Sequence, residues 1–329
     1  MFGLKIIFWL AIILVAGSII ATQIFVRRLE AKYPPIGDFA VIDGVQMHYL
    51  DIPAGPDADL EPMIFIHGAS GNVRDLYGAF IDELEGRARL IFIDRPGAGY
   101  SQTGFDGSAP LDRQVDLIAG LIDHLEIDRA VVAGHSLGGA LTAAMAVKYP
   151  EKVSGLVFLA PATHVWPGGG VTWYYDITNT PVLGRVFSET LGAPGGRLVM
   201  RRGVKGVFKP NKVPSRFFER AAVELVLRPE NFRNNASDVG NLYAYVEEMS
   251  PRYGEIGAPT VIISGDKDDV VSTQIHSEAL NQDIAGSKLV ILPDTGHAPA
   301  YTATDRIVEE IELLNRRIRE MDQDVRNSG

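Results

Sequence analysis

The sequence predicts an α/β fold: a mostly parallel sheet with helices on both faces, an inserted helical cap, and one transmembrane helix ahead of the sheet. Short apolar runs alternate with helical patterns along most of the 329 residues. Continuous runs of Val, Ile, Leu and Phe are typical of parallel strands that are buried on both faces. The alternation stops between Ala162 and Ala258, and an uncharged apolar stretch lies near the N-terminus.

The N-terminal apolar stretch covers Ile6–Val26 and contains no charged residue. As a helix, it would extend for about 31 Å, which matches the thickness of a bilayer core. A cleaved signal peptide is the alternative, because Ala16-Gly17-Ser18 provides small residues near a possible cleavage site. Apolar cores of signal peptides run for about 7–15 residues and are therefore shorter than this stretch. We expect residues 1–32 to form an uncleaved, single-pass membrane anchor.

The charges that flank this stretch bear on its orientation. Lys5 precedes it, whereas Arg27, Arg28 and Lys32 follow it. Positively charged residues accumulate on the cytoplasmic side of membrane spans. The small excess on the C-terminal side favours a cytoplasmic location for the rest of the chain, although the free N-terminal amine reduces the difference.

The chain after the anchor contains a series of predicted strands and helices. The first two strands form a hairpin, because Asp43-Gly44 favours a tight turn between them. The strands cover Phe39–Ile42, Val45–Leu50, Met63–Ile66, Arg89–Ile93, Ala130–Ala133, Val153–Leu159, Thr260–Ile263 and Lys288–Leu292. The helices cover about Asp75–Leu84, Leu111–Leu125, Leu137–Lys148 and Thr304–Met321.

The segment that interrupts the alternation is rich in Pro, Gly and aromatic residues. A structureless loop of this length is uncommon in a compact domain. Helical patterns cover Pro214–Val226 and Asn235–Glu248. We expect residues 163–258 to form a mostly helical cap over the carboxyl edge of the sheet, with residues 33–162 and 259–329 forming the core domain.

Composition and short motifs exclude several classes of function. The net charge is −10 and the sequence has no basic stripe with interleaved aromatic residues, so nucleic acid is not an expected partner. The absence of cysteine excludes disulfides and thiol nucleophiles. No His-Glu-x-x-His spacing indicates a metal. Gly97-Ala98-Gly99 follows a strand, but Gln102 replaces the third glycine of a dinucleotide fingerprint, so no cofactor is expected.

The pentapeptide Gly134-His135-Ser136-Leu137-Gly138 lies between a predicted strand and a predicted helix. This is the context of a nucleophile elbow, a sharp turn that lifts a serine hydroxyl above the sheet. The turn requires strained backbone angles, and the two glycines remove Cβ atoms that would clash there. We therefore expect Ser136 to be a catalytic nucleophile rather than an ordinary exposed serine.

A serine hydroxyl needs a base, and the base needs an acid that orients it. His297 follows the last predicted strand, at the sheet edge that also carries Ser136. Asp268 lies in the loop after the penultimate strand, and the chain order Ser, Asp, His agrees with this assignment. We predict that His297 is the base and Asp268 the acid. The other nearby carboxylates are expected to be solvated, to form turns, or to lie too close to the base in sequence: Asp266, Asp269 and Asp294.

The oxyanion of an acyl-transfer intermediate needs backbone donors. We expect the amide of Leu137, directly after the nucleophile, to be one of them. The amide of Ala69 is the other, because it lies in a glycine-containing loop after the third predicted strand. The Ser70 hydroxyl is a further candidate donor to substrate. His67 and His135 are expected to organise loops.

Five segments occur in order along the chain: His67-Gly68-Ala69-Ser70-Gly71, Asp94-Arg95-Pro96-Gly97-Ala98-Gly99-Tyr100-Ser101, Gly134-His135-Ser136-Leu137-Gly138-Gly139, Gly265-Asp266-Lys267-Asp268 and Gly296-His297. Together they resemble the α/β-hydrolase superfamily, in its capped branch of esterase- and lipase-like serine hydrolases. The resemblance extends over about residues 39–318, the cap excepted. It implies the fold but not the substrate, because the superfamily acts on many kinds of bond. Members with dehalogenase or epoxide hydrolase chemistry carry aspartate as the nucleophile, so the serine argues against both.

These observations predict a membrane-anchored serine hydrolase. Ser136 attacks a carbonyl, His297 transfers the proton, and water then attacks the acyl-enzyme. The expected substrate is a small, apolar carboxylic ester, given the cap and the anchor. The alternatives are an amide, peptide or carbon–carbon bond hydrolase with the same triad, and a non-catalytic binding module that keeps the fold.

Two groups of cap residues allow both a functional and a structural interpretation. A basic cluster is either a solvated polar face or a contact with anionic lipid headgroups. A group of aromatic residues either lines an apolar acyl pocket or forms the cap's own core. The basic residues are Arg201, Arg202, Lys205, Lys209 and Lys212, and the aromatic residues are Trp166, Trp173, Tyr174 and Tyr175.

Overall fold

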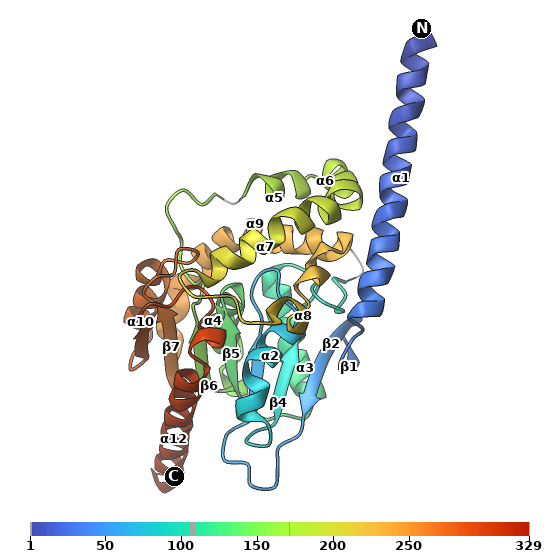
Figure 1. The fold of residues 1–329 in the computed structure, drawn as a ribbon. Coiled ribbons are helices and arrows are strands. Elements are labelled where there is room, and N and C mark those ends of the chain that lie inside the picture. Colours follow the sequence, from blue (N-terminus) through green and yellow to red (C-terminus); the bar gives the residue numbers. More distant parts are fainter. Residues whose placement is uncertain (1, 105–108, 171, 329) are drawn as a thin grey trace.

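The computed structural model describes residues 2–104, 109–170 and 172–328. Within these residues, one sheet has the strand order β1-β2-β4-β3-β5-β6-β7-β8 (Figure 1). β1 and β2 pair antiparallel at one edge, and every pairing from β4 to β8 is parallel. The predicted α/β fold with a mostly parallel sheet is therefore confirmed. The strands are β1 (Asp38–Ile42), β2 (Val45–Ile52), β3 (Met63–Ile66), β4 (Leu90–Ile93), β5 (Ala130–His135), β6 (Val153–Leu159), β7 (Thr260–Gly265) and β8 (Lys288–Leu292).

The predicted hairpin joins β1 to β2 through a two-residue turn. Asp43 and Gly44 have φ angles of 45° and 79°, the left-handed values that a tight hairpin turn requires. The other predicted strands also form, with ends that differ by up to two residues. β5 continues to His135, two residues past the predicted end, so the strand leads directly into the turn at Ser136.

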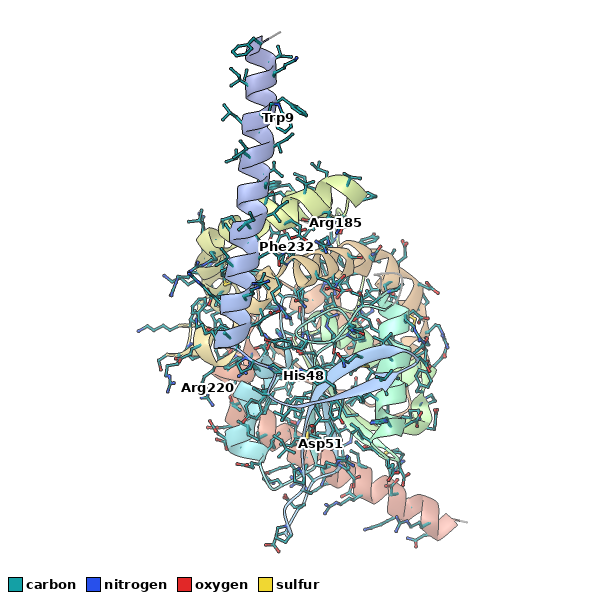
Figure 2. All side chains as sticks on the ribbon, turned by 90° about the vertical axis from the view of Figure 1, so that its right-hand side faces the viewer. Trp9, His48, Asp51, Arg185, Arg220 and Phe232 are labelled. Atoms are coloured by element: carbon teal, nitrogen blue, oxygen red, sulfur yellow. The ribbon has the colours of Figure 1, made fainter. Side chains whose placement is uncertain are left out.

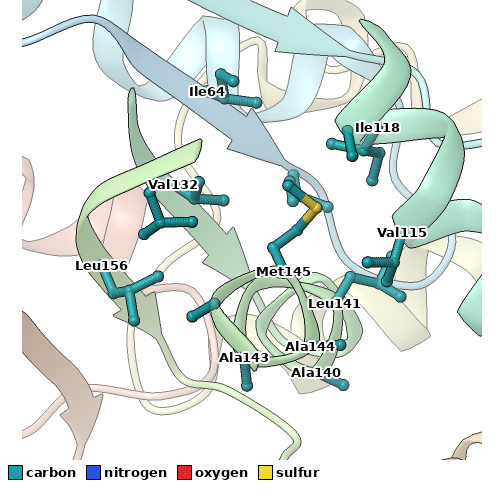
Figure 3. Packing of buried hydrophobic residues seen from close by; sticks show 14 of the residues in the cluster. Ile64, Val115, Ile118, Val132, Ala140, Leu141, Ala143, Ala144, Met145 and Leu156 are labelled. Carbon is teal, nitrogen blue, oxygen red and sulfur yellow. The ribbon is translucent and has the colours of Figure 1, made fainter. Parts of the chain in front are cut away.

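Helices cover both faces of the sheet. Those on one face are α3 (Leu111–His124) and α4 (Leu137–Lys148), and those on the other are α2 (Val73–Leu84) and α12 (Thr304–Ser328). Figure 3 shows Met145 of α4 among apolar side chains from the sheet and from α3. Buried alanines of α4, including Ala143 and Ala144, allow this helix to pack closely against the strands. The remaining short helices of this part are η1 (Pro150–Lys152), η5 (Gln274–Glu278), α10 (Ala279–Asp283) and α11 (Pro299–Thr302).

The segment between β6 and β7 is mostly helical in its described residues, and its helices lie above the ends of the strands in the view of Figure 1. Its elements are α5 (Trp173–Thr178), α6 (Pro181–Phe187), η2 (Ser188–Gly192), α7 (Ala193–Phe208), α8 (Phe217–Arg220), η3 (Val223–Leu227), α9 (Pro229–Met249) and η4 (Ser250–Glu255). The pattern at Pro214–Val226 forms two short helices rather than one, because Ala222 has a left-handed φ of 47°. α7 was not predicted, since its four glycines weaken the helical signal.

The predicted division of the chain at residues 32, 162 and 258 stays a prediction. Residue 1 of the predicted anchor, residue 171 of the predicted cap and residue 329 of the predicted core lie outside the described residues. We use the word cap for the helices between β6 and β7.

Helix α1 (Phe2–Lys32) projects away from the body of the molecule (Figures 1 and 2). Its Leu4–Lys32 part is long and apolar enough to cross a membrane, a property that signal sequences share. The helix continues past the apolar stretch Ile6–Val26 to Lys32, and the residues at its end dock on the body. Leu29 and Tyr33 are buried in a small cluster with Ala222 and Leu225.

Candidate active site

Ser136 occupies a sharp turn between β5 and α4. Its φ of 53° and ψ of −120° lie in a region that residues other than glycine rarely adopt. Two hydrogen bonds hold this conformation: the Ser136 amide donates to the carbonyl of Leu159 at 3.0 Å, and its carbonyl accepts from the amide of Ala162 at 3.0 Å. This is the backbone geometry of a nucleophile elbow.

The glycines on either side of Ser136 are required by close backbone approaches. A Cβ atom on Gly134 would overlap the carbonyl of Gly138, and one on Gly138 would overlap the carbonyls of Ile66 and His67. Because these carbonyls belong to the backbone, a side chain at either position would displace β3 or α4, and one at Gly134 would also overlap Thr142 Oγ1. The spacing of the pentapeptide therefore follows from the packing of the turn.

The structure brings Ser136, His297 and Asp268 together from three separate loops. His297 Nε2 lies 3.0 Å from Ser136 Oγ, and His297 Nδ1 lies 2.7 Å from Asp268 Oδ2. When Nδ1–H donates to the carboxylate, Nε2 is free to accept the serine proton. The side chains of His297 and Asp268 are 5% and 0% exposed, so little water competes for these contacts.

The Asp268 carboxylate has a second set of partners in its own loop. Its Oδ1 accepts hydrogen bonds from the amides of Val270 and Val271, at 2.8 and 2.9 Å. Burial favours the neutral form, but the hydrogen bond and charge of His297 and the two amides outweigh it, so the pKa of Asp268 lies below its ordinary value. The group is therefore ionised at neutral pH.

The other aspartates considered for this role have different surroundings. Asp266 pairs with Lys267, and Asp269 pairs with Lys209, each at 2.9 Å and in solvent. Asp294 has a left-handed φ of 50° and lies exposed in a turn. These surroundings agree with the expected solvated or turn-forming positions.

The two predicted oxyanion donors are both close to the nucleophile. Leu137 follows Ser136 in the chain, and the loop of Ala69 lies beside Ser136 in space. Leu137 is the first residue of α4, where backbone amides have no partner within the helix. Gly68 packs so closely that a Cβ there would lie 3.0 Å from Ser136 Cβ, which places the loop of Ala69 beside the serine. Donation by Ala69 and Leu137 to an oxyanion stays a prediction.

A family profile described as the alpha/beta hydrolase fold matches residues 61–304. The chain belongs to the α/β-hydrolase family. Lipase 3 of Moraxella sp. (strain TA144) is 28% identical over 254 residues, which are 74% of this chain and 73% of the lipase. A 2-hydroxy-6-oxononadienedioate/2-hydroxy-6-oxononatrienedioate hydrolase of Klebsiella pneumoniae is 26% identical over 249 residues, 74% of this chain and 83% of that protein. These relatives are hydrolases, which supports hydrolase activity here.

Solved structures share the fold of this α/β-hydrolase. A thermophilic esterase from Thermogutta terrifontis superposes with a TM-score of 0.67 and 22% identity, covering 86% of this chain and 99% of the esterase. The enol-lactonase from Burkholderia xenovorans LB400 gives 0.63 and 19%, with coverage of 84% and 99%. At these identities the similarity concerns the fold alone.

Two further histidines of this α/β-hydrolase, His67 and His135, make hydrogen bonds to the backbone of the loops around the site. His67 donates from Nδ1 to the Gly68 carbonyl at 2.8 Å and accepts the Arg95 amide at Nε2, at 3.1 Å. His135 donates from Nε2 to the carbonyl of His297 at 2.8 Å, which ties the elbow to the loop of the base. Burial lowers the pKa of His67 to about 3 and that of His135 to about 4, so both rings are neutral at pH 7.

A buried ionic network beneath this site was not predicted from the sequence. The Arg95 guanidinium donates to Asp238 of α9 at 2.7 Å and to Gln114 of α3 at 2.8 Å. It also donates to the carbonyls of His67 and Gly68, at 3.1 and 3.4 Å. Arg95 belongs to one of the five segments that resemble the family. No pattern in the sequence indicated that it would contact Gln114 and Asp238, which are distant along the chain.

Residues of the cap also contact the loop that carries the predicted oxyanion donor. The Ser70 amide donates to Asn235 Oδ1 at 2.5 Å, and Asn235 Nδ2 donates to the Tyr175 hydroxyl at 3.1 Å. Burial and the neighbouring Tyr174 raise the pKa of Tyr175 to about 12, so its hydroxyl stays protonated and can donate. A role of the Ser70 hydroxyl toward substrate stays a prediction.

The four aromatic residues of the cap that were considered as a group lie in different surroundings. Tyr174 packs against Tyr175 and Phe232 within the cap, with ring centroids 4.5 and 6.5 Å apart. Trp166 packs edge-to-face against Tyr243, at 5.1 Å, and Trp173 is exposed. These contacts favour the interpretation of Tyr174 and Trp166 as part of the cap's own core. Within the part of the chain that the structure describes, no group of three or more His, Asp or Glu side chains is arranged to hold a metal ion.

Proposed function

We propose that this α/β-hydrolase is a serine hydrolase that cleaves carboxylic esters through an acyl-enzyme on Ser136. The contact of 3.0 Å between Ser136 Oγ and His297 Nε2 carries the proposal, because it is a direct path for the proton of the nucleophile. The Asp268 carboxylate fixes the ring of His297 so that Nε2 faces the serine.

The reaction follows from these positions. Ser136 Oγ attacks the ester carbonyl while His297 takes its proton, and the amides of Ala69 and Leu137 bind the oxyanion that forms. His297 then donates that proton to the departing alcohol. In the second half, His297 takes a proton from water as the water oxygen attacks the acyl carbon. The bond between that carbon and Ser136 Oγ then breaks, His297 returns the proton to Ser136 Oγ, and the carboxylic acid is released.

The ester preference is supported by the similarity to a protein named a lipase. A second candidate is carbon–carbon bond hydrolysis with the same triad. It is supported by the Klebsiella relative, whose name gives a dienedioate as its substrate.

A fluorophosphonate probe and two substrate classes test the proposal. We expect the probe to label the intact chain and to fail with Ser136→Ala, because the probe forms a bond to an activated serine oxygen. Ser287→Ala, in the loop before β8, is the matched control and should be labelled normally. Turnover of aryl esters in preference to 2-hydroxy-6-oxo dienoates supports the ester assignment, and the reverse preference would replace it with the second candidate.

We also propose that α1 is retained as a single-pass anchor, with the rest of the chain in the cytoplasm. Support comes from the docking of its last turns, where Glu30 pairs with Arg228 at 3.1 Å and Lys32 with Glu224 at 3.1 Å. The intact mass of protein extracted from membranes tests retention, and protease access to sealed vesicles tests the side. A mass that lacks the first residues would favour a cleaved signal peptide.

A further inference from the structure

The cap carries an apolar outer surface on consecutive elements beside α1. We call it the cap face, and its residues are Val182, Leu183 and Val186 of α6, Leu191 of η2, and Leu198 and Val199 of α7. Val182 is 78% exposed and Leu198 is 85% exposed. α6 and α7 both contact η2, so these residues belong to one region. A group of exposed apolar residues on adjoining elements indicates an interaction site.

The charge around the cap face differs from that of the whole chain. Residues 173–212 contain seven Lys or Arg and two Asp or Glu, in a chain with a net charge of −10. Arg185, Arg201, Arg202 and Lys205 are exposed, and Figure 2 shows Arg185 at the level where α1 leaves the body. Apolar side chains flanked by basic ones are complementary to an anionic lipid surface.

Contacts of α1 fix the height of the cap face along this helix. Gln23 donates to Glu189 of η2 at 3.3 Å, and the guanidinium of Arg197 of α7 lies 5.4 Å from the centroid of the Phe25 ring. Both views show α1 running past the cap and continuing beyond it (Figures 1 and 2). The η2 and α7 part of the cap face therefore lies beside residues 23–25.

The length of α1 then sets the distance between the cap face and a bilayer. The uncharged and mostly exposed residues that precede these contacts, Ile6–Ala21, span about 24 Å as a helix, whereas a hydrocarbon core is about 30 Å thick. If α1 spans the membrane, the missing length must come from the turns beside η2 and α7. The bilayer surface consequently reaches the cap face.

We propose that the cap face lies in the headgroup region of an anionic bilayer, with Leu183 and Leu198 inserted at the edge of the hydrocarbon. This inference rests on the proposed anchoring of α1 and is independent of the chemistry of Ser136. It assigns Arg201, Arg202 and Lys205 to contact with lipid headgroups, one of the two interpretations of the basic cluster. The cap thus stands between the lipid surface and the core domain.

Single-cysteine labelling of the full chain tests this placement, and the absence of native cysteine makes it straightforward. Leu183→Cys, Leu198→Cys, Trp9→Cys and Met321→Cys are each labelled with an environment-sensitive fluorophore and placed in phosphatidylcholine–phosphatidylglycerol vesicles with nitroxide-labelled lipids. Trp9 lies on the free part of α1, and Met321 is an exposed apolar residue of α12, at the opposite end of the molecule (Figures 1 and 2).

We expect the lipid nitroxides to remove most of the fluorescence at Trp9→Cys, Leu183→Cys and Leu198→Cys, and little of it at Met321→Cys. Quenching at Trp9→Cys without quenching at the two cap positions would overturn the inference and leave the anchor intact. No quenching at any position would overturn the anchor and the inference together. Fluorophosphonate labelling of the same samples reports separately on Ser136 and on folding, since all four substitutions are at exposed residues.

A charge reversal provides a second test. Arg201→Glu/Arg202→Glu/Lys205→Glu should reduce quenching at Leu198→Cys in the anionic vesicles and leave quenching at Trp9→Cys unchanged. Arg316→Glu/Arg317→Glu/Arg319→Glu on α12 is the matched control and should leave both signals unchanged. Equal quenching at Leu198→Cys in the triple variant and its control would remove the headgroup assignment of these three residues.

Discussion

Asp266, Asp268 and Asp269 share one loop and one kind of side chain, yet their surroundings give them different chemistry. Asp268 is buried, contacts His297 at 2.7 Å and accepts two backbone amides. Asp266 and Asp269 are exposed and each pairs with a lysine. Exposed pairs of this type contribute little to stability, whereas a buried carboxylate that contacts an imidazole sets the tautomer and orientation of the ring.

Replacing Asp268 should therefore impair turnover far more than replacing its neighbour. We expect Asp268→Asn to lower kcat for an aryl ester by about 10³–10⁴-fold, because the amide cannot hold His297 in the required tautomer. Asp266→Asn should leave kcat unchanged. Steady-state kinetics on both variants, with thermal unfolding as the folding control, decide the matter, and equal effects would remove Asp268 from the triad.

At the scale of elements, α9 is the cap helix that holds the loops around the site. Asn231 and Asn234 each donate to the carbonyl of Gly97 at 3.1 Å. Asn235 binds the amide of Ser70, and Asp238 binds Arg95. These contacts connect the cap to the loops after β3 and β4, so changes in α9 reach the predicted oxyanion loop.

The ion pair of Asp238 with Arg95 should matter for stability because both side chains are buried. We expect Asp238→Ala to lower the free energy of unfolding by about 3–5 kcal/mol, since the guanidinium loses its charged partner away from water. The matched control is Glu255→Ala, which breaks the exposed pair with Arg252 and should leave the free energy of unfolding nearly unchanged. Denaturant unfolding in detergent measures both, and similar losses would show that burial does not govern this pair.

For the whole molecule, the parallel sheet gathers at one edge the loops that carry the triad, the predicted oxyanion donors and the buried histidines. His67 and His135 sit between these loops as neutral rings, with pKa values of about 3 and about 4. In the unfolded chain, a histidine binds its proton near pH 6.5. Acid therefore favours the unfolded state, because only there do both rings bind protons readily.

The stability of the whole protein should consequently depend on pH through His67. Between pH 6.5 and about 3, the unfolded state carries the His67 proton and the folded state does not, so the free energy of unfolding falls as pH falls, by about 1.4 kcal/mol per pH unit for this group. His67→Gln should reduce that slope, whereas His124→Gln, at an exposed position, should not. Denaturant unfolding across this range measures the slopes, and identical slopes in the two variants would contradict the assignment.

Much of the fold was readable along the chain because its signals are local. Buried parallel strands produce continuous apolar runs, a two-residue hairpin needs Asp43-Gly44 or its like, and the turn at Ser136 needs small residues where backbones meet. The strands, the helices on the sheet and the geometry around Ser136 agree with these patterns. Helix α7 was not predicted, because its glycines weaken the helical propensity of the segment. Tertiary contacts stabilise the helix nevertheless.

The tertiary structure determines which residues far apart in the sequence come into contact. The spacing of residues along the chain does not predict these contacts. By sequence order alone, Asp268 was one of several aspartates that could orient the base. The fold buries its side chain against His297 and leaves the neighbouring aspartates in solvent. Only the fold pairs Arg95 with Asp238, and only the docking of α1 brings η2 beside Gln23. Local patterns specify turns and strands because those depend on adjacent residues, whereas burial and pairing depend on how the whole chain closes around its sheet.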